Sequence, residues 1–253
     1  MQTEPKPMKM KPDRSASRRG FTRLELVMVL ATLALLAGIV APVLASSKIR
    51  GEQAMCFNNL RRIGQAFHLW ANDHEDRNPW LTPANAGGTY FVANPLKANA
   101  YFQMGMVSNE LATPQVLICP SDRGVGAPRR MASDFSYTNE GGFFVPGFRN
   151  AALSYIIGLH SFPGASRAIL SGDRNIRWDA LDDPCSAGID SCARIWGRSD
   201  PVSTAAWTNA IHGETGNFLF NDGRVAEISN VGFRQATKSA QDNIAVGHFL
   251  VPN

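Results

Sequence analysis

The sequence carries few of the short motifs that identify enzymes or phosphate-binding proteins. Its 253 residues contain no Gly-x-Ser-x-Gly, no His-Glu-x-x-His and no glycine-rich phosphate loop, so a catalytic serine, a metalloprotease helix and a nucleotide site are all without support. There are only four cysteines and no Cys-x-x-Cys pair, which makes zinc the less favoured role for them. The 44% of hydrophobic residues is nevertheless enough for the core of one large domain or two small ones.

Charge is also scarce, and its excess is confined to one end of the chain. Only 18% of the residues are charged, with 25 Lys and Arg against 21 Asp and Glu. The first 20 residues hold six of the basic and two of the acidic side chains, so the rest balances at 19 against 19. This polar leader should not fold by itself. No nucleic-acid partner is expected, because three arginines at positions 123, 129 and 130 are more often a solvated edge than a binding patch.

A long apolar run follows the leader. From Leu26 to Ser47 there are 22 consecutive uncharged residues, which as a helix would span roughly 33 Å and cross a bilayer. Four explanations compete: a secretory signal, a permanent signal anchor, a buried core helix and a prepilin-type signal. The run is long for a secretory signal, and a buried helix rarely follows a block of Lys and Arg. The same block predicts that the N-terminus stays in the cytoplasm and that residues after Ser47 lie outside.

The junction between leader and apolar run reads Arg-Arg-Gly20-Phe21-Thr-Arg-Leu-Glu25. Here the chain resembles type IV prepilins and type II secretion pseudopilins, whose leader ends in Gly before Phe-Thr-x-Leu-Glu and an apolar helix. The resemblance implies that a prepilin peptidase/methyltransferase cleaves between Gly20 and Phe21 and methylates the new amine of Phe21. The apolar run would then be retained in the mature protein.

Glu25 is costly at the edge of a membrane segment, so it should serve a specific purpose. In the family the matching Glu pairs with the N-terminal amine of a neighbouring subunit. The alternative is a carboxylate that reaches the headgroups and favours the helix N-terminus. Pro42 also fits the family, and it should kink or locally melt the helix because it removes one hydrogen bond.

The helical period continues beyond the apolar run. Cys56, Leu60, Ile63, Phe67 and Trp70 are spaced by 4, 3, 4 and 3 residues, which places them on one helix face. Packing of this stripe against the protein's own sheet is favoured over an oligomerisation seam. Breakers near residues 74–78 end the helix. The expected organisation is therefore a cleaved leader (1–20), a transmembrane and polymerisation helix (21–47), its amphipathic continuation (48–75) and an extracytoplasmic head (76–253).

Residues 76–253 are richer in Gly, Pro and strand-like runs. The clearest runs are 116–119, 167–171, 217–220 and 225–228, and the last two flank Asn-Asp222-Gly223-Arg, a strong tight-hairpin signal. We expect a pilin-like α+β fold in which a long N-terminal helix packs on a C-terminal antiparallel sheet with long loops.

A second resemblance concerns the head. The chain has Cys56-Phe-Asn-Asn-Leu, then Cys119-Pro-Ser-Asp122, and near the end His212 followed after nine residues by Asp222-Gly223. In this order the motifs resemble a large group of pilin-like proteins from planctomycete and verrucomicrobial bacteria. His212 and Asp222 suit a structural role better than catalysis, with Asp222 capping its hairpin and His212 bonding a backbone or carboxylate group across it.

The cysteines and acids of the head suggest disulfide bonds and a calcium site. In an exported domain, Cys185 and Cys192 suit a local disulfide and Cys56 and Cys119 a second one, although four cysteines permit three pairings. Some pseudopilins bind calcium, for which Asp122, Asp173 and Asp222 are weak candidates because no acidic run has EF-hand spacing. No other cofactor is expected.

These features predict a structural, non-enzymatic protein of the inner membrane, with a single pass and its head in the periplasm. Its partners would be the prepilin peptidase, other pilin-like subunits and an inner-membrane assembly platform, and it would assemble into a type IV pilus or a secretion pseudopilus. Two alternatives remain: a singly anchored protein whose head binds a polysaccharide or other ligand, and an exported hydrolase that uses His212.

Overall fold

The computed structural model describes residues 20–90, 94–124, 129–162, 164–185, 189–195, 203–240 and 247–252. The leader expected at 1–20 lies outside this part of the chain except for Gly20. The chain divides after Ser47 into two compact units, and α1 (Arg23–Asp73) contributes to both. The units are described in turn.

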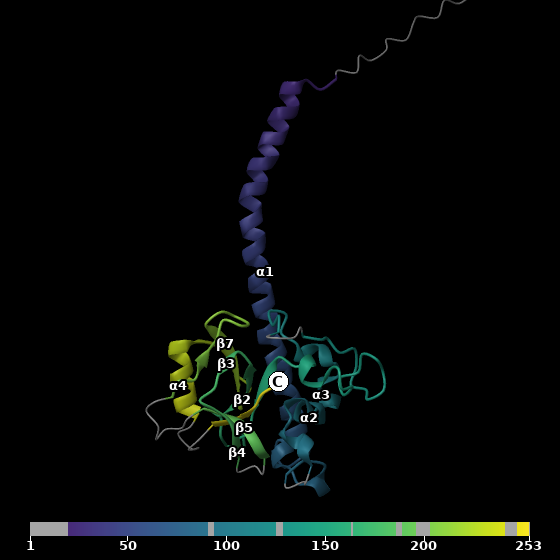
Figure 1. Cartoon of the computed structure of the whole chain (residues 1–253), viewed down its shortest axis with the longest axis vertical. Coiled ribbons are helices and arrows are strands. Elements are labelled where there is room, and N and C mark those ends of the chain that lie inside the picture. Colours follow the sequence, from purple (N-terminus) through teal and green to yellow (C-terminus); the bar gives the residue numbers. More distant parts are fainter. Residues whose placement is uncertain are drawn as a thin grey trace, which may run out of the picture. The chain divides into compact units, whose positions relative to one another are not determined.

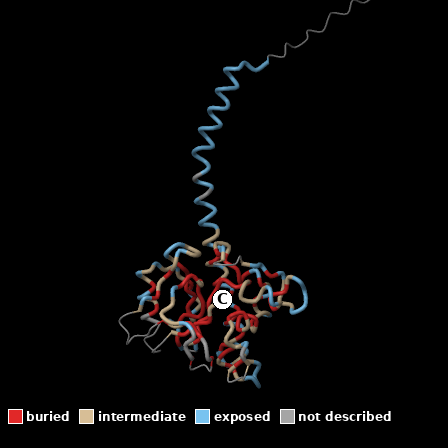
Figure 2. Tube along the Cα trace, viewed as in Figure 1, coloured by how far each residue is buried: buried red, intermediate tan, exposed pale blue. Residues whose placement is uncertain are grey.

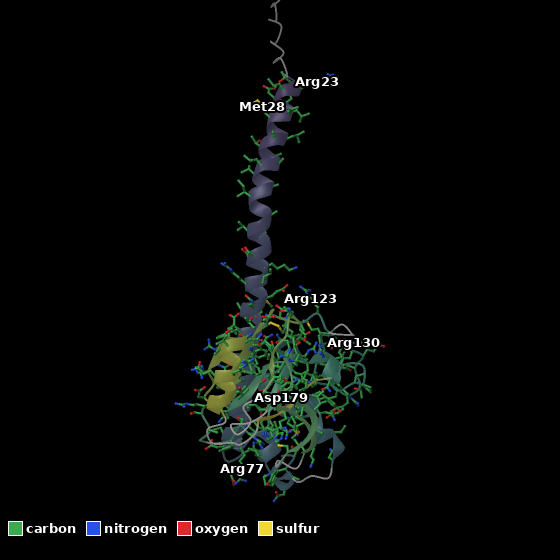
Figure 3. All side chains as sticks on the ribbon, turned by 60° about the vertical axis from the view of Figure 1, so that its left-hand side comes forward. Arg23, Met28, Arg77, Arg123, Arg130 and Asp179 are labelled. Atoms are coloured by element: carbon green, nitrogen blue, oxygen red, sulfur yellow. A yellow bond between two sulfur atoms is a disulfide. The ribbon has the colours of Figure 1, made fainter. Side chains whose placement is uncertain are left out.

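The first unit consists of the apolar part of α1. Every described side chain between Phe21 and Ser47 is exposed, including the large apolar Leu24, Leu35 and Ile39 at 70%, 69% and 62% (Figure 2). Within the described residues, α1 is the single helix long and apolar enough to cross a membrane. Figure 3 shows side chains such as Arg23 and Met28 standing out from the helix on all sides. Pro42 lies within α1, and its side chain is outside the described part of the structure.

The second unit, Lys48–Asn253, contains the rest of α1 and the expected α+β head (Figure 1). The predicted stripe from Cys56 to Trp70 is buried, with exposures of 0% to 9%, and belongs to the main core cluster. Gly64 lets α1 approach the sheet closely, because a Cβ there would lie 2.9 Å from Leu219 Cδ1. The stripe therefore packs on the protein's own sheet, as predicted. The helix ends where Asp76 N donates to Ala71 O, a terminal bond in which Glu75 takes a left-handed φ of 57°.

Short helices connect α1 to the first strand of the sheet, and one more helix, α4, lies between the last two strands that the structure describes. They are η1 (Pro79–Leu81), η2 (Ala84–Ala86), η3 (Pro95–Ala98), α2 (Ala100–Met106), α3 (Ser108–Leu111), η4 (Pro114–Leu117), η5 (Arg149–Ala152) and α4 (Asn230–Ala240).

The main sheet has seven strands, and all its neighbours run antiparallel. Its order is β4 (Ala180–Cys185), β5 (Ile189–Ile195), β9 (Gly247–Leu250), β1 (Tyr155–Gly158), β2 (Ile169–Asp173), β7 (Thr215–Phe220) and β8 (Val225–Ser229). A separate pair is formed by β3 (Ile176–Arg177) and β6 (Ala206–Trp207).

The two faces of this sheet belong to different cores. On β7, Leu219 joins the core that contains α1, α2 and α3, whereas its neighbours Phe218 and Phe220 join a second core with Phe233 of α4. This alternation follows from the period of two along a strand. It agrees with Figure 1, in which α4 lies on the opposite side of the strands from α2 and α3.

The predicted strands are right at three of four places. Runs 167–171, 217–220 and 225–228 correspond to β2, β7 and β8, and the last two form the predicted hairpin, with Leu219 opposite Val225. The run 116–119 is not a strand. Pro114 begins η4 there, and its fixed φ suits the first turn of a helix while its missing N–H weakens a sheet.

Candidate functional site

The N-terminal motif forms a helix cap. Thr22 N donates to Glu25 Oε2 at 2.8 Å, and Glu25 N donates back to Thr22 Oγ1 at 3.2 Å. This reciprocal pair is a capping box, in which Thr and a Glu three residues later satisfy N–H groups at the helix start. In the single chain, Glu25 therefore has a partner of its own. This contact corresponds to the alternative role expected for it, a carboxylate that favours the helix N-terminus, and pairing with a second subunit stays a prediction. Phe21, just before the cap, is 81% exposed.

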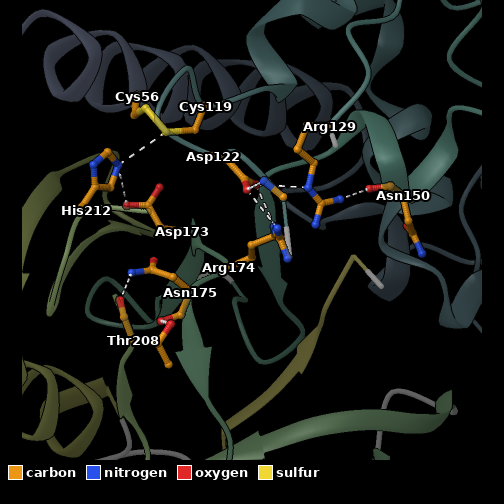
Figure 4. A network of polar contacts seen from close by, with 11 residues as sticks. Cys56, Cys119, Asp122, Arg129, Asn150, Asp173, Arg174, Asn175, Thr208 and His212 are labelled. Atoms are coloured by element: carbon orange, nitrogen blue, oxygen red, sulfur yellow. Dashed lines mark hydrogen bonds and ion pairs between the residues drawn. A yellow bond between two sulfur atoms is a disulfide. The ribbon is translucent and has the colours of Figure 1, made fainter. Parts of the chain in front are cut away.

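His212 belongs to a group of buried polar contacts inside the head (Figure 4). Its side chain is 2% exposed, and its Nε2 lies 3.5 Å from Asp173 Oδ2 and 3.4 Å from Cys119 Sγ. Burial lowers the pKa of His212, and the more distant carboxylates of Glu227, Asp122 and Glu52 oppose that shift only in part. The expected carboxylate partner exists, but it is Asp173 of β2 and not a group of the hairpin that follows His212.

Asp173 is the most deeply buried acid of the network, with a side chain 0% exposed. Its Oδ2 accepts hydrogen bonds from Asn217 N at 2.7 Å and Asn217 Nδ2 at 2.9 Å, whereas Oδ1 has no hydrogen-bond partner in the described structure. Burial raises the pKa of Asp173 to about 7, although the Asn217 bonds act in the opposite direction. Asp173 is thus a carboxyl group that titrates near neutral pH beside a histidine that resists protonation.

Asp122 anchors a second group of charges next to this pair. Arg174 binds it in a bidentate manner, with Nε 2.7 Å from Oδ2 and Nη2 2.9 Å from Oδ1. Arg129 Nε adds an ion pair at 3.2 Å, and Arg129 Nη1 also donates to Asn150 O. Burial alone would raise the pKa of Asp122, but the hydrogen bonds from Arg174 and Gly124 N and the charges of Arg174 and Arg129 together keep that pKa below its ordinary value.

The three arginines that lie close together in the sequence, at positions 123, 129 and 130, have different surroundings in the structure. Arg129 has a side chain only 10% exposed and faces Asp122, while Arg123 is 72% exposed. Figure 3 places Arg123 and Arg130 at the periphery of the second unit. One of the three cations of the expected basic cluster is therefore neutralised in the interior.

A disulfide joins the network to the helix. Cys56 of α1 and Cys119 are bonded, with an S–S distance of 2.01 Å across a sequence separation of 63 residues. This is one of the two pairings expected from the sequence. The other, between Cys185 and Cys192, is wrong: neither takes part in a disulfide with the other, and Cys185 Sγ instead lies 3.3 Å from His160 Nε2.

Asp222 and Gly223 form the turn of the β7–β8 hairpin. Asp222 Oδ1 accepts from Arg224 N at 3.0 Å, as expected of a residue that caps its own turn. Gly223 has a φ of +82°, the left-handed value at which glycine is favoured. His212 and Asp222 are thus separate structural elements: the first lies in the interior and the second in an exposed turn.

The three calcium candidates each have other partners. Asp122 has both oxygens on arginines, Asp173 accepts from Asn217, and Asp222 closes its own turn. Calcium requires six to eight oxygens, and these three carboxylates already have other donors. The calcium expectation gains no support from their placement.

Several residues of the network carry no local sequence signal. Asn217 and Arg174 reach the site only because β2 and β7 are neighbours in the sheet. His160 and His248, 88 residues apart, meet at 3.2 Å for the same kind of reason. Their pairing depends on strand order, which single-sequence patterns do not specify.

Comparison with known proteins yields no relative: no family model matches the chain, and no curated protein or solved structure shows significant similarity to it.

Proposed function

We propose that the protein is a pilin-like subunit, cleaved after Gly20, methylated at Phe21 and held in the inner membrane by the first half of α1. The observation that carries the proposal is the position of Glu25. Glu25 is the last residue of Gly20-Phe-Thr-Arg-Leu-Glu25 and lies directly before an uncharged apolar segment. The large apolar side chains of that segment are exposed. An apolar helix with this exposure requires lipid or other helices around it.

The mechanism is one of packing. The helix would stay in the bilayer with its basic leader in the cytoplasm, and after cleavage it would leave the lipid to pack among equivalent helices. Within such a bundle, the Glu25 carboxylate would neutralise the Phe21 amine of a neighbour, because an unpaired charge in an apolar core is costly. The head, whose core includes the stripe from Cys56 to Trp70, would lie on the filament surface.

A second candidate function is a singly anchored protein whose head binds an extracellular ligand. The capping box favours it, because Glu25 already has Thr22 as a partner within the chain. The hydrolase alternative lacks such support: the ring nitrogen of His212 that would act as base is buried against Cys119 and Asp173.

Two matched variants distinguish a filament subunit from a singly anchored protein. Glu25→Gln keeps a side chain able to form the capping box but removes the charge, whereas Thr22→Val removes the capping oxygen and keeps the charge. We expect Glu25→Gln to abolish filaments in sheared-cell fractions while membrane insertion persists, and Thr22→Val to retain filaments. Normal filaments from Glu25→Gln would reject charge pairing, and no filaments from the wild type would favour the anchor.

Processing is tested by mass spectrometry of the N-terminal peptide from native membranes. A peptide that begins with methyl-Phe21 is the expected product. An intact Met1, or a peptide that begins near Ser46, would contradict the prepilin assignment.

A further inference from the structure

Three side chains that commonly bind metals converge at the other end of the sheet from the hairpin strands. Cys185 is the last residue of β4, His248 lies in β9, and His160 follows β1 by two residues. The ligand atoms of these three residues all lie within 4.8 Å of one another.

The distances fit a common bound atom. Cys185 Sγ lies 3.3 Å from His160 Nε2, and His248 Nδ1 lies 3.2 Å from the same nitrogen. In a tetrahedral zinc site, bonds of about 2.0–2.1 Å to nitrogen and about 2.3 Å to sulfur place neighbouring ligand atoms roughly 3.3–3.6 Å apart. The cluster therefore needs only small side-chain shifts to surround an ion.

Backbone hydrogen bonds hold the two histidines close together. The strand register alone does not place Cys185 beside them, because Cys185 is opposite Ile189 of β5 and His248 is opposite Arg194 of the same strand. Leu159 N donates to His248 O at 3.0 Å, which fixes the segment that carries His160. Cys185 and His248 are 7% and 8% exposed, so the site is largely shielded from water.

We propose that His160, Cys185 and His248 bind a zinc ion through His160 Nε2, Cys185 Sγ and His248 Nδ1, with water in the fourth position. Two neutral imidazoles and one thiolate form a borderline-soft donor set of the kind that zinc takes. Binding displaces the thiol proton of Cys185, so affinity should fall as the pH is lowered. The site is independent of the membrane helix and of assembly.

The other sulfur and histidine cluster in the head does not offer the same chemistry. Cys56, Cys119 and His212 are equally close, but the two sulfurs are consumed by a disulfide and neither is a thiolate. Of the two clusters, only that of Cys185 combines a thiol with two imidazoles.

The test uses the full-length chain in detergent. Elemental analysis after incubation with zinc and removal of excess should give about one zinc per chain. Cobalt, which substitutes for zinc, should give a thiolate-to-cobalt absorption band. We expect Cys185→Ser to abolish the band and His248→Gln to weaken zinc binding at least tenfold, because removing one of few ligands loses most of the affinity.

Two variants serve as controls. His68→Gln removes an exposed histidine of α1 and should leave zinc binding unchanged. Cys192→Ser removes the other buried thiol and should retain the cobalt band, since the proposal does not use Cys192. Integrity of the Cys56–Cys119 disulfide by peptide mapping and a cooperative thermal transition show that each variant is folded.

Four results would contradict zinc binding by Cys185, and the first three need no variant. They are substoichiometric zinc in the wild type, binding of copper but not zinc, a Cys185–Cys192 disulfide in protein isolated from its native compartment, and a cobalt band that survives in folded Cys185→Ser. Loss of the band in folded Cys192→Ser would also reject this ligand set.

Discussion

His212 Nε2 lies 3.5 Å from Asp173 Oδ2, and this contact joins two buried groups whose protonation equilibria burial shifts in opposite directions. The histidine belongs to a loop before β7 and the aspartate to the end of β2. Burial disfavours the charged form of each group. Just below neutral pH, a protonated Asp173 and an uncharged His212 can therefore lie in contact without a buried charge.

The pH dependence of stability should reveal Asp173. Its folded pKa of about 7 exceeds the ordinary value near 3.9, so the folded state binds the extra proton and stability is lost as the pH rises toward and through 7. In urea unfolding, the free energy of unfolding of Asp173→Asn relative to that of the wild type should therefore rise by about 3 kcal/mol between pH 5 and pH 8. Burial of His212 acts in the opposite direction in both proteins, because its lowered pKa makes the folded state lose stability as the pH falls below about 6.5.

The matched control for that measurement is Asp222→Asn, an identical change in an exposed hairpin turn. Its difference from the wild type should stay nearly constant with pH. A constant difference for Asp173→Asn as well would mean that Asp173 is ionised throughout this pH range.

The Cys56–Cys119 disulfide should make a large contribution to the stability of the head. It closes a loop across 63 residues, and loop entropy of that length amounts to about 4 kcal/mol. Replacing both cysteines by Ala should lower the free energy of unfolding by about 2–5 kcal/mol, the range seen when native disulfides are removed. A reductant should destabilise the wild type similarly and leave the double variant unchanged; equal sensitivity of both would assign the effect to other thiols.

Local patterns predicted the elements but not their long-range contacts. The stripe from Cys56 to Trp70 and the Asp222-Gly223 turn were recognisable because each is set by neighbours within a few residues. The expected strand at 116–119 is wrong because Pro114, two residues before the run, begins the short helix η4.

The interior of the site was beyond such patterns. Asp173 was only one of several loop acids in the sequence, and its role depends on burial between β1 and β7. Cys185 and Cys192 were close enough in sequence to suggest a disulfide, yet the bulged β4–β5 register places Cys192 opposite Asp183 and Cys185 opposite Ile189.

Gly223 should be required for its backbone conformation rather than for space. A Cβ there would meet His68 Nε2 at an ordinary 3.6 Å, but φ is +82°. Gly223→Ala should cost about 1–2 kcal/mol of stability, and Gly223→Asn less, because Asn tolerates left-handed φ. Gly51→Ala, the same change in a helix with open space around it, should be neutral or stabilising in the same thermal unfolding assay. Equal effects at both positions would contradict the conformational explanation.

The Asp122–Arg174 pair offers the sharpest contrast between a buried and an exposed ion pair in one molecule. Arg174 has a side chain 12% exposed and makes two bonds to a carboxylate that is 1% exposed. Arg123 is 72% exposed and lies 3.4 Å from Glu52. Arg174→Met should cost about 3–5 kcal/mol, because it leaves Asp122 buried with Arg129 as its one remaining cation among the described contacts.

Arg123→Met should change stability by about 0–1 kcal/mol, since solvent screens an exposed pair. The double replacement of Asp122 by Asn and Arg174 by Met should recover part of the loss, because no unpaired charge is then left in the interior. If Arg174→Met and Arg123→Met unfold at the same urea concentration, the network around Asp122 is not the buried brace that its distances indicate.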